Sequence, residues 1–236
     1  MAYQSCFQRY ELKYMLTQRQ KDAFLEVIRP YMTLDQFGRT TIRNLYYDTD
    51  SYRLIRHSIE RPAYKEKLRV RSYRLASASD DVFVELKKKY KSIVYKRRLA
   101  MPQSEALQWL RGDDGVAPQG QISNEITYFR DYYGSIHPTV FLSYEREAFF
   151  CHDGSDFRVT FDENVLAREQ DLSLGIEPYG TALLPEGMTL LELKVSGAIP
   201  LWVTEFLTKQ RIYKTSFSKY GTAYQKMLFQ GGKLCV

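Results

Sequence analysis

The sequence lacks the glycine-rich loops that commonly hold nucleotide phosphates. Neither Gly-x-x-x-x-Gly-Lys-Ser/Thr nor Gly-x-Gly-x-x-Gly occurs among its 236 residues. Its three histidines, His57, His137 and His152, stand at irregular spacing in loop-like segments, which gives no support for a catalytic histidine. If this chain binds a nucleotide, side chains rather than a backbone loop must hold the phosphates.

Cysteines and long apolar runs are also scarce. Cys6, Cys151 and Cys235 are odd in number and lack metal-ligand spacing, so neither a disulfide framework nor a zinc site is predicted. No run of about 18 apolar residues occurs, and the first residues lack the basic and apolar regions of a signal peptide. We therefore expect a soluble, cytoplasmic protein in a reducing compartment, with no membrane segment in this chain.

Aromatic and strand-forming residues are abundant. The chain has 19 Tyr and 13 Phe, and 44% of its residues are hydrophobic, which is enough material for a core and argues against disorder. The formal net charge of +6 is a moderate excess, so the placement of the charges matters more than their total. All-β barrels with added helices reach this size as one unit, so residues 1–236 are expected to form a single domain.

Charged residues stand at every second position in four segments, between apolar residues. Because a strand sends alternate side chains to opposite faces, the cations of residues 65–71 would share one face, opposite Leu68 and Val70. Such strands suit a barrel with a basic interior that a polyanion would neutralise, although a sandwich with outward charges gives the same pattern. The alternating sets are Lys65, Lys67, Arg69 and Arg71; Glu85 and Lys87; Lys96 and Arg98; Glu192 and Lys194.

Hydrophobic periodicity predicts both helices and strands. Thr17 and Gln20 have the spacing of a capping box, and the helix that follows should end near Pro30. Further helices are expected near residues 51–57, 105–110, after Ser123 or Asn124, and over 203–213 and 218–229. The expected strands are 9–14, 41–47, 64–73, 82–88, 92–99, 140–149, 157–162 and 189–195.

Seven short motifs occur in a particular order along the chain. They are Arg9-Tyr10-Glu11-Leu12-Lys13-Tyr14, Lys67-Leu68-Arg69-Val70-Arg71, Val84-Glu85-Leu86-Lys87, Tyr95-Lys96-Arg97-Arg98, Tyr144-Glu145-Arg146, Leu191-Glu192-Leu193-Lys194 and Phe217-Ser218-Lys219-Tyr220. No single motif is specific, but the ordered set resembles the VTC-type polyphosphate polymerase domain, a member of the triphosphate tunnel metalloenzymes. The resemblance extends from Arg9 to about Tyr224.

This resemblance implies a fold and an activity. The fold is a closed antiparallel β-barrel of about eight strands, with a basic tunnel inside and helices packed outside. The activity is the transfer of the terminal phosphate of ATP onto a growing polyphosphate chain, with Mn²⁺ or Mg²⁺ required. ATP and polyphosphate would be the partners of the chain.

The resemblance also implies site residues. Glu192 would bind the metal, with Glu11 and Glu85 as weaker metal candidates, and Tyr144 and Ser218 would add hydroxyl contacts to the phosphates. The alternation adds Lys67, Arg98 and Lys194 as further phosphate-binding candidates. The residues implied to hold phosphates during catalysis are Lys13, Arg69, Arg71, Lys87, Lys96, Arg146, Arg158 and Lys219.

Other interpretations of these residues stay open. Glu192 could be a salt-bridge partner, Glu11 and Glu85 could orient basic side chains, and Ser218 could be only a helix N-cap. Tunnel enzymes that hydrolyse triphosphates or cyclise ATP begin with Glu-x-Glu-x-Lys, whereas this chain has Arg9 at the first acidic position. This difference argues against those branches of the superfamily.

Two other functions compete with the polymerase. A triphosphate or polyphosphate hydrolase of the same fold would differ only in using water as the acceptor, and a non-catalytic module would bind polyphosphate without turnover. Nucleic acid is not an expected partner, because the aromatic pairs Tyr46-Tyr47 and Phe149-Phe150 are typical of core and hairpin packing rather than of a base-stacking surface.

Overall fold

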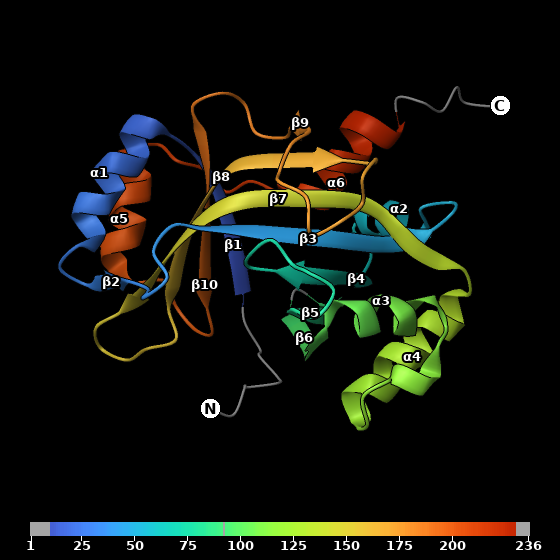
Figure 1. Ribbon diagram of the computed structural model, residues 1–236. Coiled ribbons are helices and arrows are strands. Elements are labelled where there is room, and N and C mark those ends of the chain that lie inside the picture. The colour runs from blue at the N-terminus through green and yellow to red at the C-terminus, as the bar shows by residue number, and fades with distance from the viewer. Residues whose placement is uncertain (1–9, 92, 230–236) are drawn as a thin grey trace.

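A computed structural model describes residues 10–91 and 93–229 (Figure 1). It confirms the α+β class, with helices around one antiparallel sheet of ten strands. The strands are β1 (Tyr10–Thr17), β2 (Met32–Leu34), β3 (Thr40–Thr49), β4 (Tyr64–Ser72), β5 (Asp81–Tyr90), β6 (Ile93–Pro102), β7 (Ile136–Cys151), β8 (Arg158–Arg168), β9 (Thr181–Ala182) and β10 (Met188–Val195). The helical elements are α1 (Gln18–Ile28), α2 (Arg53–Ile59), α3 (Gln103–Arg111), the 3-10 turn η1 (Asp114–Val116), α4 (Gln121–Tyr133), α5 (Leu201–Lys209), α6 (Lys219–Ala223) and the π-helical turn η2 (Tyr224–Leu228).

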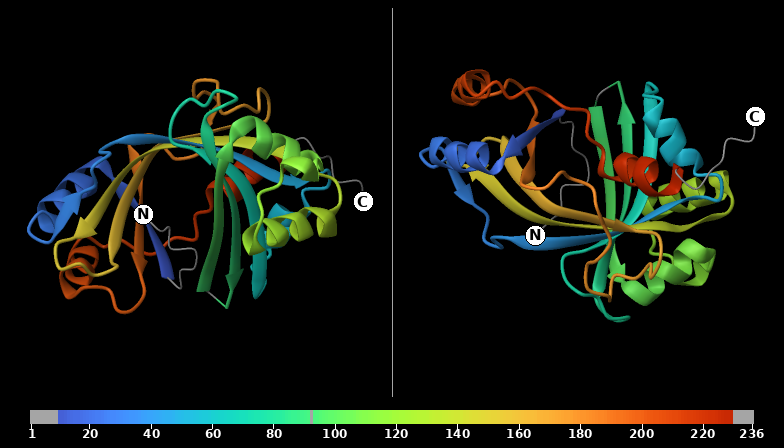
Figure 2. Two further views of the ribbon diagram at one scale, coloured as in Figure 1. Left: turned by 60° about the horizontal axis from the view of Figure 1, so that its bottom comes forward. Right: turned by 90° about the horizontal axis from the view of Figure 1, so that it is seen from above.

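The sheet is curved into an arch. Eight strands follow one another in the order β1-β10-β8-β7-β3-β4-β5-β6, which agrees with the predicted number, while β2 and β9 pair with β7 and β8 outside this path. The long strand β7 has 16 residues and pairs with β3 on one side and β8 on the other. In the left view of Figure 2 the edge strands β1 and β6 form the two feet of the arch, on either side of its concave face.

The prediction of a closed barrel is wrong in one respect. Within residues 10–91 and 93–229, no strand pairing joins β1 to β6. The free edge of β1 is partly occupied by another segment, because Thr215 N donates to Lys13 O at 2.7 Å and Tyr14 forms a bridge with Lys214. A side-chain contact links β1 instead to β5, the neighbour of the edge strand β6, with Lys87 Nζ 2.8 Å from Glu11 Oε2.

Helices α1, α3, α4 and α5 cover the convex side of the arch, where they pack on apolar faces of the strands, whereas α2 and α6 pack on the concave side against β3 and β7. Over β4, β5 and β6, Leu68 and Val84 belong to one core with Trp109 of α3. Over β1, β8 and β10, Leu191 shares a second core with Phe24 of α1 and with residues of α5. The opposite, concave faces of these same strands carry the charged residues.

Local helix signals in the sequence were partly accurate. The capping box is confirmed, since Gln20 N donates to Thr17 Oγ1 at 3.3 Å and Thr17 N donates to Gln20 Oε1 at 3.0 Å. Helix α4 begins at Gln121, two to three residues before the expected caps Ser123 and Asn124. It has 13 residues, and none of the helices in the part of the chain that the structure describes is long and apolar enough to cross a membrane.

Candidate functional site

The concave face of the arch gathers basic side chains from many strands. The alternation is confirmed in β4, where Leu68 and Val70 are fully buried in the convex-side core and the cations between them point the other way. The cations on the concave face include Lys13, Lys67, Arg69, Arg71, Lys87, Lys96, Arg98, Arg146, Lys194 and Lys219. They are in contact with fewer carboxylates, namely Glu11, Glu85, Asp162 and Glu192.

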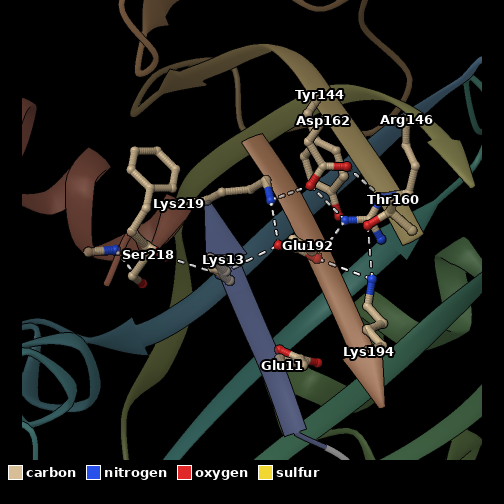
Figure 3. Close-up of polar contacts among 12 residues, drawn as sticks. Glu11, Lys13, Tyr144, Arg146, Thr160, Asp162, Glu192, Lys194, Ser218 and Lys219 are labelled. Atoms are coloured by element: carbon tan, nitrogen blue, oxygen red, sulfur yellow. Dashed lines mark hydrogen bonds and ion pairs between the residues drawn. The ribbon is translucent and has the colours of Figure 1, made fainter. Parts of the chain in front are cut away.

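Glu192 of β10 lies at the centre of one cluster of charges (Figure 3). Its carboxylate oxygens lie 3.0 Å from both Lys219 Nζ and Arg146 Nη2. Lys194 Nζ at 3.2 Å and Lys13 Nζ at 3.5 Å complete the cluster. Burial opposes ionisation, but the surrounding cations outweigh it and hold the pKa of Glu192 well below its usual range.

Asp162 of β8 is the second acid of this cluster, and the sequence analysis missed it. Its fully buried carboxylate accepts two hydrogen bonds from Arg146, Nε to Oδ1 at 2.5 Å and Nη2 to Oδ2 at 2.6 Å. Lys219 Nζ lies 2.5 Å from the same Oδ2. Burial alone would raise the pKa of Asp162, yet the two cations lower it. Asp162 therefore fixes the positions of two of the expected phosphate-binding residues.

A signal for Asp162 was present in the sequence. It alternates with Arg158 along one strand and so shares its face. The strand predicted from the sequence ended at Asp162, whereas β8 continues to Arg168, so the residue lies inside the sheet.

Glu85 of β5 organises a second cluster on the other half of the arch. Arg69 Nε donates to its Oε2 at 2.8 Å, and Arg98 Nε donates to its Oε1 at 2.7 Å. Lys96 Nζ lies 2.6 Å from Oε1, and Arg71 Nε lies 3.8 Å from Oε2. Burial opposes the charge on Glu85, but its neighbours, Arg71 first, hold its pKa well below the usual range.

Neutral groups orient the central arginines without cancelling their charge. Arg71 donates from Nε to Asn44 Oδ1 at 3.0 Å and from Nη2 to the Tyr144 hydroxyl at 3.1 Å. Arg69 donates from Nη1 to the Tyr46 hydroxyl at 2.9 Å. The expected hydroxyl residue Tyr144 therefore lies beside an expected phosphate-binding arginine.

The C-terminal segment brings Ser218 and Lys219 to the concave face. Ser218 Oγ accepts a hydrogen bond from Gly221 N at 3.2 Å, so the residue is an N-cap, and a second from Lys67 Nζ at 3.1 Å. No carboxylate of the described residues lies within ion-pair distance of Lys67. Burial and the neighbouring lysines, Lys13 first, lower the pKa of Lys67 to about 7.

The remaining candidates lie toward the edges of the face. Lys87 of β5 and Glu11 of β1 form an ion pair across the concave face. Burial and Glu192 would raise the pKa of Glu11, but Lys87, Lys194 and Lys13 together lower it to about 2. Arg158 lies opposite Lys194 in the strand register, with its guanidinium 4.4 Å from the centre of the Phe150 ring. Arg9, Cys6 and Cys235 lie outside the described residues.

Whether the carboxylates of the concave face suit a divalent metal depends on how they are grouped and on which of their oxygens are already engaged. Among residues 10–91 and 93–229, no group of three or more His, Cys, Asp or Glu side chains is placed to hold an ion. Mg²⁺ and similar hard ions are commonly held by one or two carboxylates together with substrate phosphates and water. Glu192, 6% exposed on the concave face, fits that donor set better than the fully buried Asp162, both of whose oxygens accept from Arg146.

The arrangement can hold a chain of phosphates by side chains alone. Guanidinium groups match phosphate oxygens in pairs, and lysines add compact charges around them. Because cations exceed acids here, an anionic ligand would relieve repulsion within the face. Side chains from both halves of the arch take part, so a ligand of several linked phosphates could contact both clusters at once.

Comparison with known proteins shows similarity to one protein family and to solved structures of low sequence identity. The family profile described as the VTC domain matches residues 8–228. No curated protein matches the chain. A candidate adenylate cyclase from Bacillus halodurans has a similar solved structure, with 13% identity, a TM-score of 0.58 and coverage of 91% of this chain and 96% of that one.

A second solved structure is a candidate adenylyl cyclase from Hippeastrum with a dominant triphosphatase activity. It is 14% identical, has a TM-score of 0.54, and the match covers 97% of each chain. At such low identity these two structures establish a shared fold.

Proposed function

The chain belongs to the VTC domain family, and from this premise we propose that it is a metal-dependent polyphosphate polymerase. It would transfer the terminal phosphate of ATP to the end of a polyphosphate chain and release ADP. The observation that carries the proposal is the excess of largely buried cations over carboxylates across both halves of the concave face. Such a face suits a long polyanion, and the arch and its two feet would form the wall of a tunnel around it.

Phosphoryl transfer needs mainly positioning and charge stabilisation from the protein. We assign these tasks to the cations of the two clusters, with Asp162 and Glu85 as the acids that orient them. Tyr144 and Ser218 would add hydroxyl contacts. The proposed phosphate-binding set is Lys13, Lys67, Arg69, Arg71, Lys87, Lys96, Arg98, Arg146, Arg158, Lys194 and Lys219.

The carboxylates of the concave face favour a phosphate chain over water as the acceptor. An oxygen of a terminal phosphate is already ionised, so it can attack the γ-phosphorus of ATP without a general base, while the bond to the β-phosphate breaks and ADP leaves with the electron pair. Water would have to lose a proton to a base. The acids of the concave face have lowered pKa values and are therefore weak bases.

A bound Mn²⁺ or Mg²⁺ would add charge neutralisation at the transferring phosphate. Glu192 is the residue that we propose would hold it, together with phosphate oxygens of the substrate. Glu11 and Glu85 have more specific partners, since Glu11 of β1 pairs with Lys87 of β5 and Glu85 is enclosed by cations. We assign both of them an orienting role.

A hydrolase is the second candidate function, and the dominant triphosphatase activity of the Hippeastrum relative favours it. Arg9 in place of the first acid of Glu-x-Glu-x-Lys opposes it. The two functions differ only in the acceptor of the phosphate, so the products distinguish them.

The test is incubation of the purified chain with ATP and Mn²⁺ or Mg²⁺, followed by a gel stained for polyphosphate and assays for ADP and free phosphate. The proposal predicts ADP together with polymer. ADP with free phosphate alone would establish the hydrolase. Tight polyphosphate binding without any turnover would indicate a non-catalytic binding module.

A further inference from the structure

A pocket of about 310 Å³ lies on the convex side of the sheet, away from the proposed polyphosphate site. Arg43 of β3 and Ser143 of β7 line it, as do Glu177 and Pro178 from the loop between β8 and β9. Alternation places Arg43 on the same face as Leu45, which belongs to the convex-side core. The orange loop that follows β8 passes over this side of the arch in the left view of Figure 2.

Two buried polar atoms in this pocket are without a hydrogen-bond partner among the described residues, namely Arg43 Nε and Ser143 Oγ. The Arg43 side chain is 8% exposed, and Ser143 is 1% exposed. The two residues lie directly opposite each other in the register of β3 and β7, so both side chains rise from the same face of the sheet. Buried donors that lack a partner reduce stability, which makes such a pair uncommon unless something binds it.

Of the two paired donors of the Arg43 guanidinium, Nε and Nη2, only Nη2 has a hydrogen-bond partner in the part of the chain that the structure describes. Nη1 donates to Thr41 O at 3.4 Å, and Nη2 donates to Glu177 Oε2 at 3.3 Å. The Nε and Nη2 atoms of an arginine point the same way and normally bind two oxygens of one anion, as those of Arg146 do with Asp162. In Arg43 one of the two donors is free, and the other has only a long contact with a side chain that is 74% exposed.

We propose that this pocket binds a phosphate group. Two phosphate oxygens would accept from Arg43 Nε and Nη2, and a third would accept from the Ser143 hydroxyl, while Glu177 swings out into solvent. A tetrahedral anion fits better than a carboxylate, because a carboxylate has no third oxygen for Ser143. The nearby acid Glu145 does not prevent this, since its charge is compensated by Arg39, whose Nε donates to it at 2.6 Å.

The site is close in the structure to the concave face but separate from it. Arg43 and Ser143 each adjoin, along their strands, a residue that contacts Arg71 on the other side of the sheet: Asn44 and Tyr144. The ligand of the pocket is a free phosphate or phosphate monoester, and its binding does not depend on the polymerase activity.

The test is calorimetric titration of inorganic phosphate into the full chain after tripolyphosphate has saturated the concave face. The variants are Arg43→Gln and Glu177→Gln, with Glu60→Gln as the matched control because Glu60 is 72% exposed, lies at the end of α2 and does not line the pocket. We expect one saturable phosphate site in the parental protein. Arg43→Gln should weaken it at least tenfold, Glu177→Gln should tighten it severalfold by removing the competing carboxylate, and Glu60→Gln should leave it unchanged.

Several results would overturn the proposal. They are the absence of saturable phosphate binding, equal affinity in the parental protein and Arg43→Gln, or binding of acetate as tightly as phosphate. If Arg43→Gln does not fold, Ser143→Ala keeps the charge and should still weaken phosphate binding severalfold, and no weakening there would also refute the site. If tripolyphosphate itself does not bind, the polymerase proposal fails, and the phosphate titration with the same variants still decides the pocket.

Discussion

Arg97 and Arg98 are consecutive in β6, yet their guanidinium groups lie on opposite sides of the sheet. Arg98 Nε donates to Glu85 Oε1 at 2.7 Å on the concave face, whereas Arg97 Nε donates to Glu125 Oε2 at 3.1 Å on the convex side. Their side chains are similarly exposed, at 23% and 26%. The two residues therefore differ in the face that they point to and little in charge, size or exposure.

This pair gives the first prediction. Arg98→Ala should weaken tripolyphosphate binding by about 10- to 100-fold, because a charge-assisted hydrogen bond contributes roughly 1.5–3 kcal/mol. Arg97→Ala should change the affinity by less than about threefold, since its charge acts only at long range and is screened by salt. Calorimetric titration at constant ionic strength measures both, with thermal melts as folding controls. Equal losses in the two variants would show that the concave face is not the binding surface.

The second prediction concerns Glu192 and the metal. Glu192→Gln keeps the size of the side chain but removes the charge that a hard divalent ion requires, so polymer formation should fall by roughly 100-fold or more. Binding of tripolyphosphate in chelator should be retained or tightened, because the cations around Glu192 lose their counter-charge. The measurements are polymer formation across a Mn²⁺ titration, affinity in chelator, and a melt. A folded variant that makes polymer at the parental rate would make Glu192 a salt-bridge residue and move the metal to Glu11 or Glu85.

The third prediction is a pH dependence from Lys67. Its pKa of about 7 in the free protein means that it becomes neutral as the pH rises above 7. A bound polyanion favours the charged ammonium, so binding above pH 7 must take up a proton, and affinity should decrease as the pH rises. Lys67→Arg stays charged, so the loss of affinity between pH 6.5 and 8.5 should be roughly tenfold larger in the parental protein than in this variant. If the affinity falls by the same factor between pH 6.5 and 8.5 in the parental protein and in Lys67→Arg, this role for Lys67 is excluded.

The fourth prediction concerns acid stability. The pKa of Glu85 is lowered on folding, so its contribution to stability is present above its unfolded pKa, near 4.5, and is lost as the pH falls through the lower folded value. At pH 7, Glu85→Gln should reduce the free energy of unfolding by about 3 kcal/mol or more, because it leaves buried cations without their acid. As the pH falls below 4.5, the free energy of unfolding should decrease less in Glu85→Gln than in the parental protein. Denaturant titrations at several pH values test this, and parallel curves for the two proteins would contradict it.

Much of the local structure could be predicted from the sequence, because it depends on short-range patterns. The capping box of Thr17 and Gln20 and the alternation in residues 64–73 needed no distant contacts. The open edge of the sheet does involve such contacts, since residues 214–215 occupy the edge of β1 although they are about 200 residues away in sequence. No periodicity in the strands themselves encodes that contact.

For the candidate site, too, local patterns could be predicted from the sequence, whereas long-range contacts could not. The charged faces of the strands were visible as alternating residues, and the structure brings them together on one surface. Asp162 was missed because its strand was predicted to end there. Arg43 and Ser143 were missed for another reason, because each resembles an ordinary strand residue until the register places one opposite the other.

The destination of the terminal phosphate of ATP is the most direct test of the proposed function. ATP labelled on its γ-phosphate, incubated with the protein and Mn²⁺, is separated into polymer, unreacted nucleotide and free phosphate. We predict that most of the released label enters acid-stable chains that lengthen with time, and that Arg98→Ala strongly reduces this incorporation at limiting ATP whereas Arg97→Ala retains it. Label that appears only as free phosphate, or that never leaves ATP, would contradict the assignment of a polyphosphate polymerase.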